Sequence, residues 1–227
     1  MCRTFTVLGA VLMASLSFGA NAHEIYAKAG FLGAGVGYAY GVNESFTLRG
    51  DVTTMGSYHR DGNVSNLDYK GTLRNNQAMV YGDWFPFNNG FRLSAGLGVR
   101  DTRIKADGRP NSNGNVTIGD TTVAYGADDS VSATAELPAV APYIGIGWGH
   151  NVGQQRKAGW GFVADAGIAF GKPKVNFSVS DSLYAKLNAA TGGQAQAEID
   201  KQQREIEDKA NKLKVFPSLY IGVSYTF

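Results

Sequence analysis

The sequence has little cysteine and little histidine: one cysteine, Cys2, and 3 histidines in 227 residues. A single thiol excludes an intramolecular disulfide, and with it the class of small disulfide-stapled secreted scaffolds. Scattered histidines without cysteine partners form no metal-ligand pattern, so we predict no metal site and no cofactor. Charge of one sign is also missing, because 21 Lys+Arg stand against 19 Asp+Glu. Nucleic-acid binding is not expected, since it needs a basic patch or stripe.

Long apolar runs are confined to the N-terminus. Residues 1–22 have a short basic start, an apolar stretch and a small-x-small motif that ends at Ala22. This order is typical of a secretory signal peptide and predicts cleavage between Ala22 and His23. Beyond this point no run of about 18 apolar residues exists, which excludes a membrane-spanning helix. If residues 23–227 cross a membrane, they must do so with strands.

Glycine, in contrast, is abundant at 30 of 227 residues, roughly twice its ordinary share. It recurs in segments where apolar residues occupy every second position, as Phe46, Leu48 and Val52 do. This period predicts strands whose two faces meet different surroundings. Repeated small residues on the other face suit the crowded inside of a tightly curved barrel. The predicted strands lie near 23–30, 33–41, 46–57, 69–84, 91–103, 139–150, 159–170 and 216–227.

The connections between these strands alternate between short and long. The long ones cover about 57–68, 104–138 and 171–215. Short turns on one side and long loops on the other are the layout of an outer-membrane barrel. We therefore predict an all-β fold over residues 23–227, an eight-stranded antiparallel up-and-down transmembrane β-barrel with long extracellular loops. Turn signals predict a small hairpin in the second loop, and charge pairs four residues apart predict a helix over 194–214 in the third.

Aromatic residues flank the three short turns, at one rim of the predicted barrel. Rings at a membrane interface form such a girdle, whereas a soluble core would scatter its tryptophans along the strands. The predicted periplasmic girdle consists of Tyr40, Phe46, Trp84, Phe91, Trp148 and Trp160.

Charged residues on the inward face of the strands form the second candidate site. An eight-stranded lumen is only wide enough for side chains, so these charges are expected to pair into a network that fills it. A conducting or ligand-selecting lumen is the alternative. The three positive and three negative residues are Arg49, Asp51, Asp83, Arg92, Arg100 and Asp165.

Several strand segments resemble the small outer-membrane β-barrels of Gram-negative bacteria, the OmpA-like, OmpX-like and OmpW-like barrels. The segments that carry the resemblance are 46–49, 83–87, 142–147 and 221–227. The resemblance implies a Gram-negative outer-membrane location, with outer-membrane lipid and the assembly machinery as partners. The last strand, with Tyr225 and Phe227, is similar to the assembly signal of that family.

Function is less constrained than fold, because this family includes anchors, small-solute pores, host-contact proteins and lipid-modifying enzymes. We expect a structural or interaction protein whose loops meet the environment, with an extracellular ligand or host surface that the sequence does not identify. The alternative is a narrow pore for small solutes, hydrophobic ones included. A lipid-A-modifying enzyme needs a nucleophile beside a histidine base. Only His59 with Ser57 and Asp61 approaches that pattern, so we predict no catalytic residues.

Overall fold

The computed structural model describes residues 22–64, 67–110, 114–154, 157–212 and 214–227. Apart from Ala22, the predicted signal peptide over 1–22 lies outside the described residues. Cleavage before His23 therefore stays a prediction. His23 is the first residue of the first strand, and its backbone exchanges two hydrogen bonds with that of Phe227, of 3.3 and 2.9 Å.

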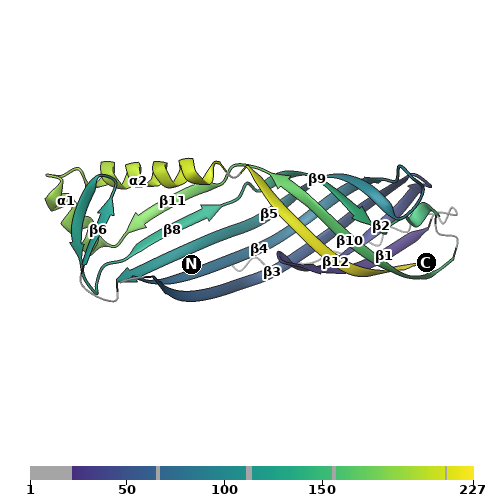
Figure 1. Cartoon of the computed structure of the whole chain (residues 1–227), viewed down its shortest axis with the longest axis horizontal. Helices are drawn as coiled ribbons and strands as arrows, with labels where there is room; N and C mark the ends of the chain where they lie inside the picture. The colour runs from purple at the N-terminus through teal and green to yellow at the C-terminus, as the bar shows by residue number, and fades with distance from the viewer. Residues whose placement is uncertain (1–21, 65–66, 111–113, 155–156, 213) are drawn as a thin grey trace, which may run out of the picture.

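Eight antiparallel strands close into a ring, which confirms the predicted up-and-down barrel (Figure 1). The ring is closed by pairing of the first strand with the last. Consecutive strands of the ring are neighbours, so the chain makes no crossover within it. In chain order, the ring strands are β1 (His23–Gly30), β2 (Gly33–Asn43), β3 (Phe46–Val64), β4 (Leu67–Trp84), β5 (Phe91–Pro110), β9 (Val140–Trp148), β10 (Gly159–Phe170) and β12 (Val215–Thr226).

The expected loop over 57–68 is instead a continuation of the β3–β4 hairpin, whose strands pair as far as Val64 and Leu67. A bulge between Thr54 and Gly56 marks the place where β3 leaves the ring, because its pairing with β2 ends at Thr54. Beyond the ring both faces of the hairpin can meet water. The apolar alternation that predicts a membrane strand is then no longer needed, and its loss made this segment resemble a loop.

The expected loop over 104–138 also contains regular structure. β5 continues to Pro110, and β6 (Gly114–Ile118) pairs with β7 (Thr121–Tyr125) in the predicted small hairpin. β8 (Val131–Glu136) then pairs with the outer part of β5, and β11 (Lys174–Val179) pairs with β8. The sheet of the barrel therefore extends outward as β4–β5–β8–β11.

Two helices complete this outer part. The predicted helix over 194–214 corresponds to α2 (Ala195–Ala210), which packs along β11 (Figure 1). Sequence analysis missed α1 (Asp181–Ala190), which begins after the cap Ser180. Neither helix, in the part of the chain that the structure describes, is long and apolar enough to cross a membrane.

We call β6, β7, β8, β11, α1 and α2 together the head. The head has its own apolar core, separate from the apolar clusters of the barrel. The buried residues of this core are Ile118, Val123, Leu183, Leu187, Ala195 and Ile199.

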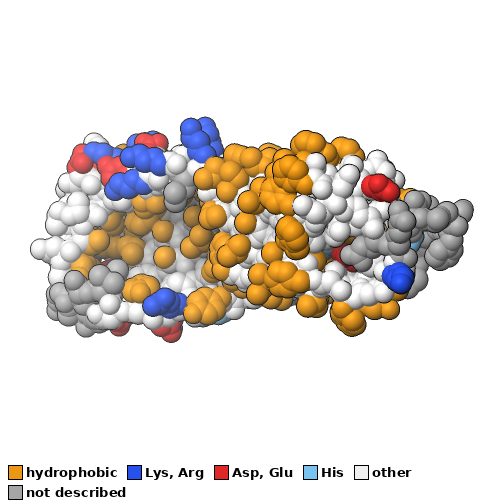
Figure 2. All heavy atoms as spheres, turned by 45° about the vertical axis from the view of Figure 1, so that its right-hand side comes forward, with side chains coloured by type: hydrophobic (Ala, Val, Ile, Leu, Met, Phe, Trp, Pro, Cys, Tyr) orange, Lys and Arg blue, Asp and Glu red, His pale blue; other side chains and the backbone are white. Residues whose placement is uncertain are grey.

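A band of exposed apolar side chains surrounds the barrel, while charged side chains gather at the head (Figure 2). Leu97, for example, is 61% exposed and Ile146 is 51% exposed. Soluble monomers rarely expose so large an apolar surface, whereas a transmembrane barrel needs one as its lipid-facing band. The band includes Ile25, Val36, Leu48, Val80, Leu97, Ile146, Phe162, Leu219 and Ile221.

The predicted girdle aromatics lie at the end of the barrel that carries the short turns. The register places Phe46 opposite Trp84, Phe91 opposite Trp148, and Trp160 opposite Tyr225. Tyr40 lies opposite His23, and the ring of His23 also lies close to that of the C-terminal Phe227. This grouping is a matter of geometry, and the role of these rings at a membrane interface remains a prediction.

Candidate functional site

Four charged side chains meet inside the barrel, because side chains alternate between the two faces of each strand. Arg49 of β3, Asp83 of β4, Arg92 of β5 and Asp165 of β10 are all buried. Arg49 Nε donates to Asp83 Oδ2 at 2.7 Å, and Arg49 Nη2 donates to Asp165 Oδ1 at 3.2 Å. Arg92 Nη2 donates to the same Asp165 oxygen at 2.6 Å. We call these four residues, whose formal charges cancel, the ionic plug.

Glycine makes room for the ionic plug. Gly147 of β9 lies opposite Arg92 on one side and Asp165 on the other. A Cβ atom at Gly147 would lie 1.8 Å from Arg92 Nη1, closer than any van der Waals contact allows. The repeated glycines of the sequence thus have a specific use here, since the missing side chain leaves space for a guanidinium group.

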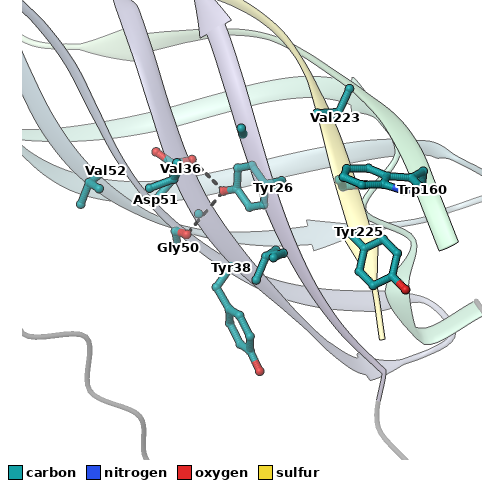
Figure 3. A pocket seen from close by; sticks show the side chains of 13 residues that line it. Tyr26, Val36, Tyr38, Gly50, Asp51, Val52, Trp160, Val223 and Tyr225 are labelled. Carbon is teal, nitrogen blue, oxygen red and sulfur yellow. Dashed lines mark hydrogen bonds between the residues drawn. The ribbon is translucent and has the colours of Figure 1, made fainter. Parts of the chain in front are cut away.

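Asp51, expected in the same network, pairs instead with Lys28, which was not predicted to belong to that network. Lys28 Nζ lies 2.5 Å from Asp51 Oδ2, and both side chains are buried. Tyr26 donates to the same oxygen at 2.8 Å, and its hydroxyl lies between Gly50 and Asp51 (Figure 3). Lys28 was missed because the phase of the first strand was not fixed from the sequence. The alternation of Glu24, Tyr26 and Lys28 with small and apolar residues was the available signal.

A third polar cluster lies in the lumen at the end with the short turns. His150 Nδ1 and Glu24 Oε1 are hydrogen-bonded, and neither side chain is exposed. Thr226 donates to the other Glu24 oxygen at 3.3 Å, and Thr47 donates to the His150 carbonyl at 3.0 Å. The ring of Tyr26 lies 4.4 Å from that of His150, so this cluster joins the Lys28–Asp51 pair.

Uncharged side chains cross the outer half of the lumen. Gln77 of β4 donates to the hydroxyl of Tyr220 on β12 at 3.1 Å. Asn75 donates to the carbonyl of Leu32 in the β1–β2 turn at 2.8 Å, and accepts a hydrogen bond from Thr102 at 2.6 Å. The β1–β2 turn is thereby tied to a buried side chain of β4.

A cavity of about 210 Å³ lies in this outer half of the lumen, and its lining runs from Asp165 of the ionic plug outward past these contacts to Leu73 and Ile104. Its lining is largely aromatic and apolar, with the edge-to-face pair of Tyr81 and Tyr143, 5.2 Å apart, as part of it. Other lining residues are Met79, Ala141, Phe216 and Tyr220.

Arg100 does not join the ionic plug, although the alternation of inward and outward side chains along its strand predicts that it points into the lumen. It lies eight residues farther out along β5 than Arg92, which at about 3.4 Å per residue is roughly 27 Å. That distance is beyond the reach of an arginine side chain. Arg100 Nε donates instead to the carbonyl of Pro138 at 3.0 Å, and its guanidinium lies 5.1 Å from the ring of Phe216.

The candidate catalytic residues remain apart from this lumen. Ser57, His59 and Asp61 are exposed on the outer part of β3, and no hydrogen bond between their side chains is found in the described structure. Within the described ranges, no group of three or more His, Cys, Asp or Glu side chains is placed to hold a metal ion.

No protein-family model and no curated protein sequence matches the chain. Its structure is similar to the crystal structure of Acinetobacter baumannii CarO2, with a TM-score of 0.61 and 21% sequence identity over 91% of this chain and 98% of that one. It is also similar to Acinetobacter baumannii CarO, with a TM-score of 0.54 and 18% identity over 90% and 97% of the two chains. At these identities the similarity concerns the fold. With its closed ring of eight strands, the chain has the fold of the small outer-membrane β-barrels.

Proposed function

We propose that this chain works in the Gram-negative outer membrane as a closed barrel that carries an external interaction head. The observation that supports closure is the ionic plug, in which Arg49 connects Asp83 and Asp165. The proposed partners are outer-membrane lipid around the apolar band and, during biogenesis, the assembly machinery. In this proposal Tyr225 and Phe227 belong to the assembly signal, and the girdle aromatics mark the periplasmic interface.

Closure follows from how tightly the charges are paired. Charged side chains in a water-filled lumen would keep their hydration. The side chains of Arg49, Asp83 and Arg92, in contrast, have no exposed surface. Desolvated charges are stable only when partners replace the lost water. Here each carboxylate of the ionic plug contacts both arginines. This pairing supports the proposal that the lumen is closed to water and ions at this level.

The head supplies the interaction part of the proposal. It has a packed core, and it extends the barrel sheet on its outer side. Tyr184, on α1 of the head, is 38% exposed. Exposed aromatic residues on a rigid support are typical of binding surfaces.

Conductance across a planar lipid bilayer tests the closed barrel. We expect no stable conductance steps from the refolded chain. The matched variant Arg92→Ser/Asp165→Ser removes one pair, keeps the net charge and leaves the Arg49–Asp83 pair. It should conduct, which also shows that the protein inserts. Steps of the same size from both proteins would contradict the ionic plug as the barrier.

A narrow pore for small solutes is the second candidate, and the cavity in the outer half of the lumen favours it. For a solute to pass, the ionic plug would have to rearrange. Swelling of vesicles that contain the refolded chain, in solutions of small uncharged solutes, distinguishes the two candidates. Swelling as fast with this chain as with the Arg92→Ser/Asp165→Ser variant would favour the pore.

A further inference from the structure

The cavity in the outer half of the lumen has the size and lining of a small-molecule site. Its volume of about 210 Å³ corresponds to roughly seven water molecules. It is below the ordinary range for drug-sized ligands, about 300–1,000 Å³. Phe216, Tyr220, Tyr81 and Met79 line it with apolar surface, which water alone would solvate poorly.

One positive charge on this lining has no countercharge. Arg100 forms no ion pair within the described part of the chain, and its Nη2 atom is buried without a hydrogen-bond partner. The other charged residues that line the cavity are already paired: Lys28 with Asp51, and Asp165 with the arginines of the ionic plug. An unpartnered guanidinium nitrogen costs free energy when it is buried, unless an acceptor reaches it.

We propose that this cavity binds a small organic monoanion, with its carboxylate on Arg100 and its apolar or aromatic body against Phe216 and Tyr220. An inorganic anion would leave the apolar lining unfilled, and a cation would face the unpaired guanidinium. Arg100 already lies 5.1 Å from the Phe216 ring, so a carboxylate on Arg100 places the attached body beside aromatic rings. This inference goes beyond the proposed closed barrel, because it assigns a ligand class to the lumen and does not require passage.

Three compounds of nearly the same shape test the charge requirement: benzoate, benzamide and benzamidine. The refolded chain is labelled on its methionine methyl groups. Met79 lines the cavity and reports binding, whereas Met55 does not line it and serves as the internal reference. The variants Met79→Leu and Met55→Leu assign the two signals. At neutral pH we expect benzoate to shift the Met79 signal in a saturable way, at least about tenfold more tightly than benzamide, and benzamidine not to bind.

Arg100→Gln should weaken benzoate binding by about tenfold or more, since one charge-assisted hydrogen bond is lost. The matched control is Arg103→Gln, which removes the same charge from an exposed arginine of the same strand that pairs with Asp101 and Glu136. It should leave binding unchanged. The proposal is overturned if benzoate gives no saturable shift, if benzamide binds as tightly, or if folded Arg100→Gln keeps its affinity. If Arg100→Gln does not fold, the comparison of the three compounds on the unchanged chain still tests whether the cavity prefers an anion.

Discussion

Arg49 and Asp165 lie on strands that are four places apart in either direction around the ring, and yet their side chains are 3.2 Å apart. The ion pair therefore spans the diameter of the barrel. Gln77 and Tyr220 lie on another pair of opposite strands and meet at 3.1 Å, farther toward the head. The lumen is bridged at two levels, and the cavity is lined by Asp165 of the inner level and by Gln77 and Tyr220 of the outer one.

The first prediction concerns the ionic plug. Arg49→Ala should destabilise the refolded barrel by about 3–5 kcal/mol, because it leaves two buried carboxylates, Asp83 and Asp165, with the single positive charge of Arg92. The urea midpoint of unfolding measures this. Arg103→Ala, which removes an exposed arginine, should have little effect. An equally small effect of Arg49→Ala would indicate a hydrated lumen and contradict closure.

The second prediction concerns the lipid-facing band. Leu97→Arg should destabilise the barrel in lipid vesicles by about 2–4 kcal/mol, the cost of arginine near the bilayer midplane. Tyr58→Arg is the control, because Tyr58 is about as exposed but lies on the hairpin beyond the ring. If the two substitutions have the same effect on unfolding, the apolar band does not contact hydrocarbon.

The third prediction concerns the core of the head. Leu187 has no exposed surface, and its truncation to alanine should cost about 2–5 kcal/mol locally. Amide hydrogen exchange should become faster in α1 and α2 and stay unchanged in the ring strands. Tyr184→Ala, on the exposed side of α1, should change neither. Faster exchange throughout the barrel with Leu187→Ala would show that head and barrel unfold together.

The fourth prediction concerns acid. Burial alone would raise the pKa of Asp129, but hydrogen bonds from Lys186 and Ser182, both 2.6 Å, outweigh it and lower the pKa below its ordinary value. A carboxyl with a lowered pKa stabilises the folded state above its ordinary pKa of about 3.9, and this contribution is lost as the pH falls toward the folded value. Protection of the α1 amides should therefore decrease below about pH 4.

The variant Asp129→Asn checks this assignment. It should lower α1 protection already at neutral pH and remove the further decrease in acid. The neighbouring exposed Asp128 serves as the control, and Asp128→Asn should keep the behaviour of the unchanged chain. An acid-induced loss of protection that persists in Asp129→Asn would assign the effect to another group.

The fold of the barrel was predictable because a lipid-facing strand must alternate. Hydrocarbon outside and side-chain packing inside impose opposite demands on successive residues, so β10 was expected over 159–170 and spans Gly159–Phe170. The head lacks this double constraint. α1 left only a short signal, Leu183 and Leu187 four residues apart behind the cap Ser180, and it was missed.

The pairing inside the lumen was less predictable than its composition. The alternation along each strand indicates which charged side chains point inward. Which of them form ion pairs depends on how far along the barrel axis each residue lies. Arg100 points inward and is too far from the ionic plug, while Lys28 reaches Asp51 from two strands away. Strand tilt and register set these heights, and neither can be obtained from a single sequence.

β5 is a single strand of 20 residues, roughly 65 Å long at about 3.3 Å per residue, whereas the apolar band of such barrels is about 25 Å tall. Even with a tilt of about 40°, a large part of this strand stands clear of the bilayer. The head is therefore held at a fixed standoff from the membrane, where a flexible tether would sample many distances. A partner that binds the head therefore loses less free energy to ordering, because folding has already restricted the motion of the head.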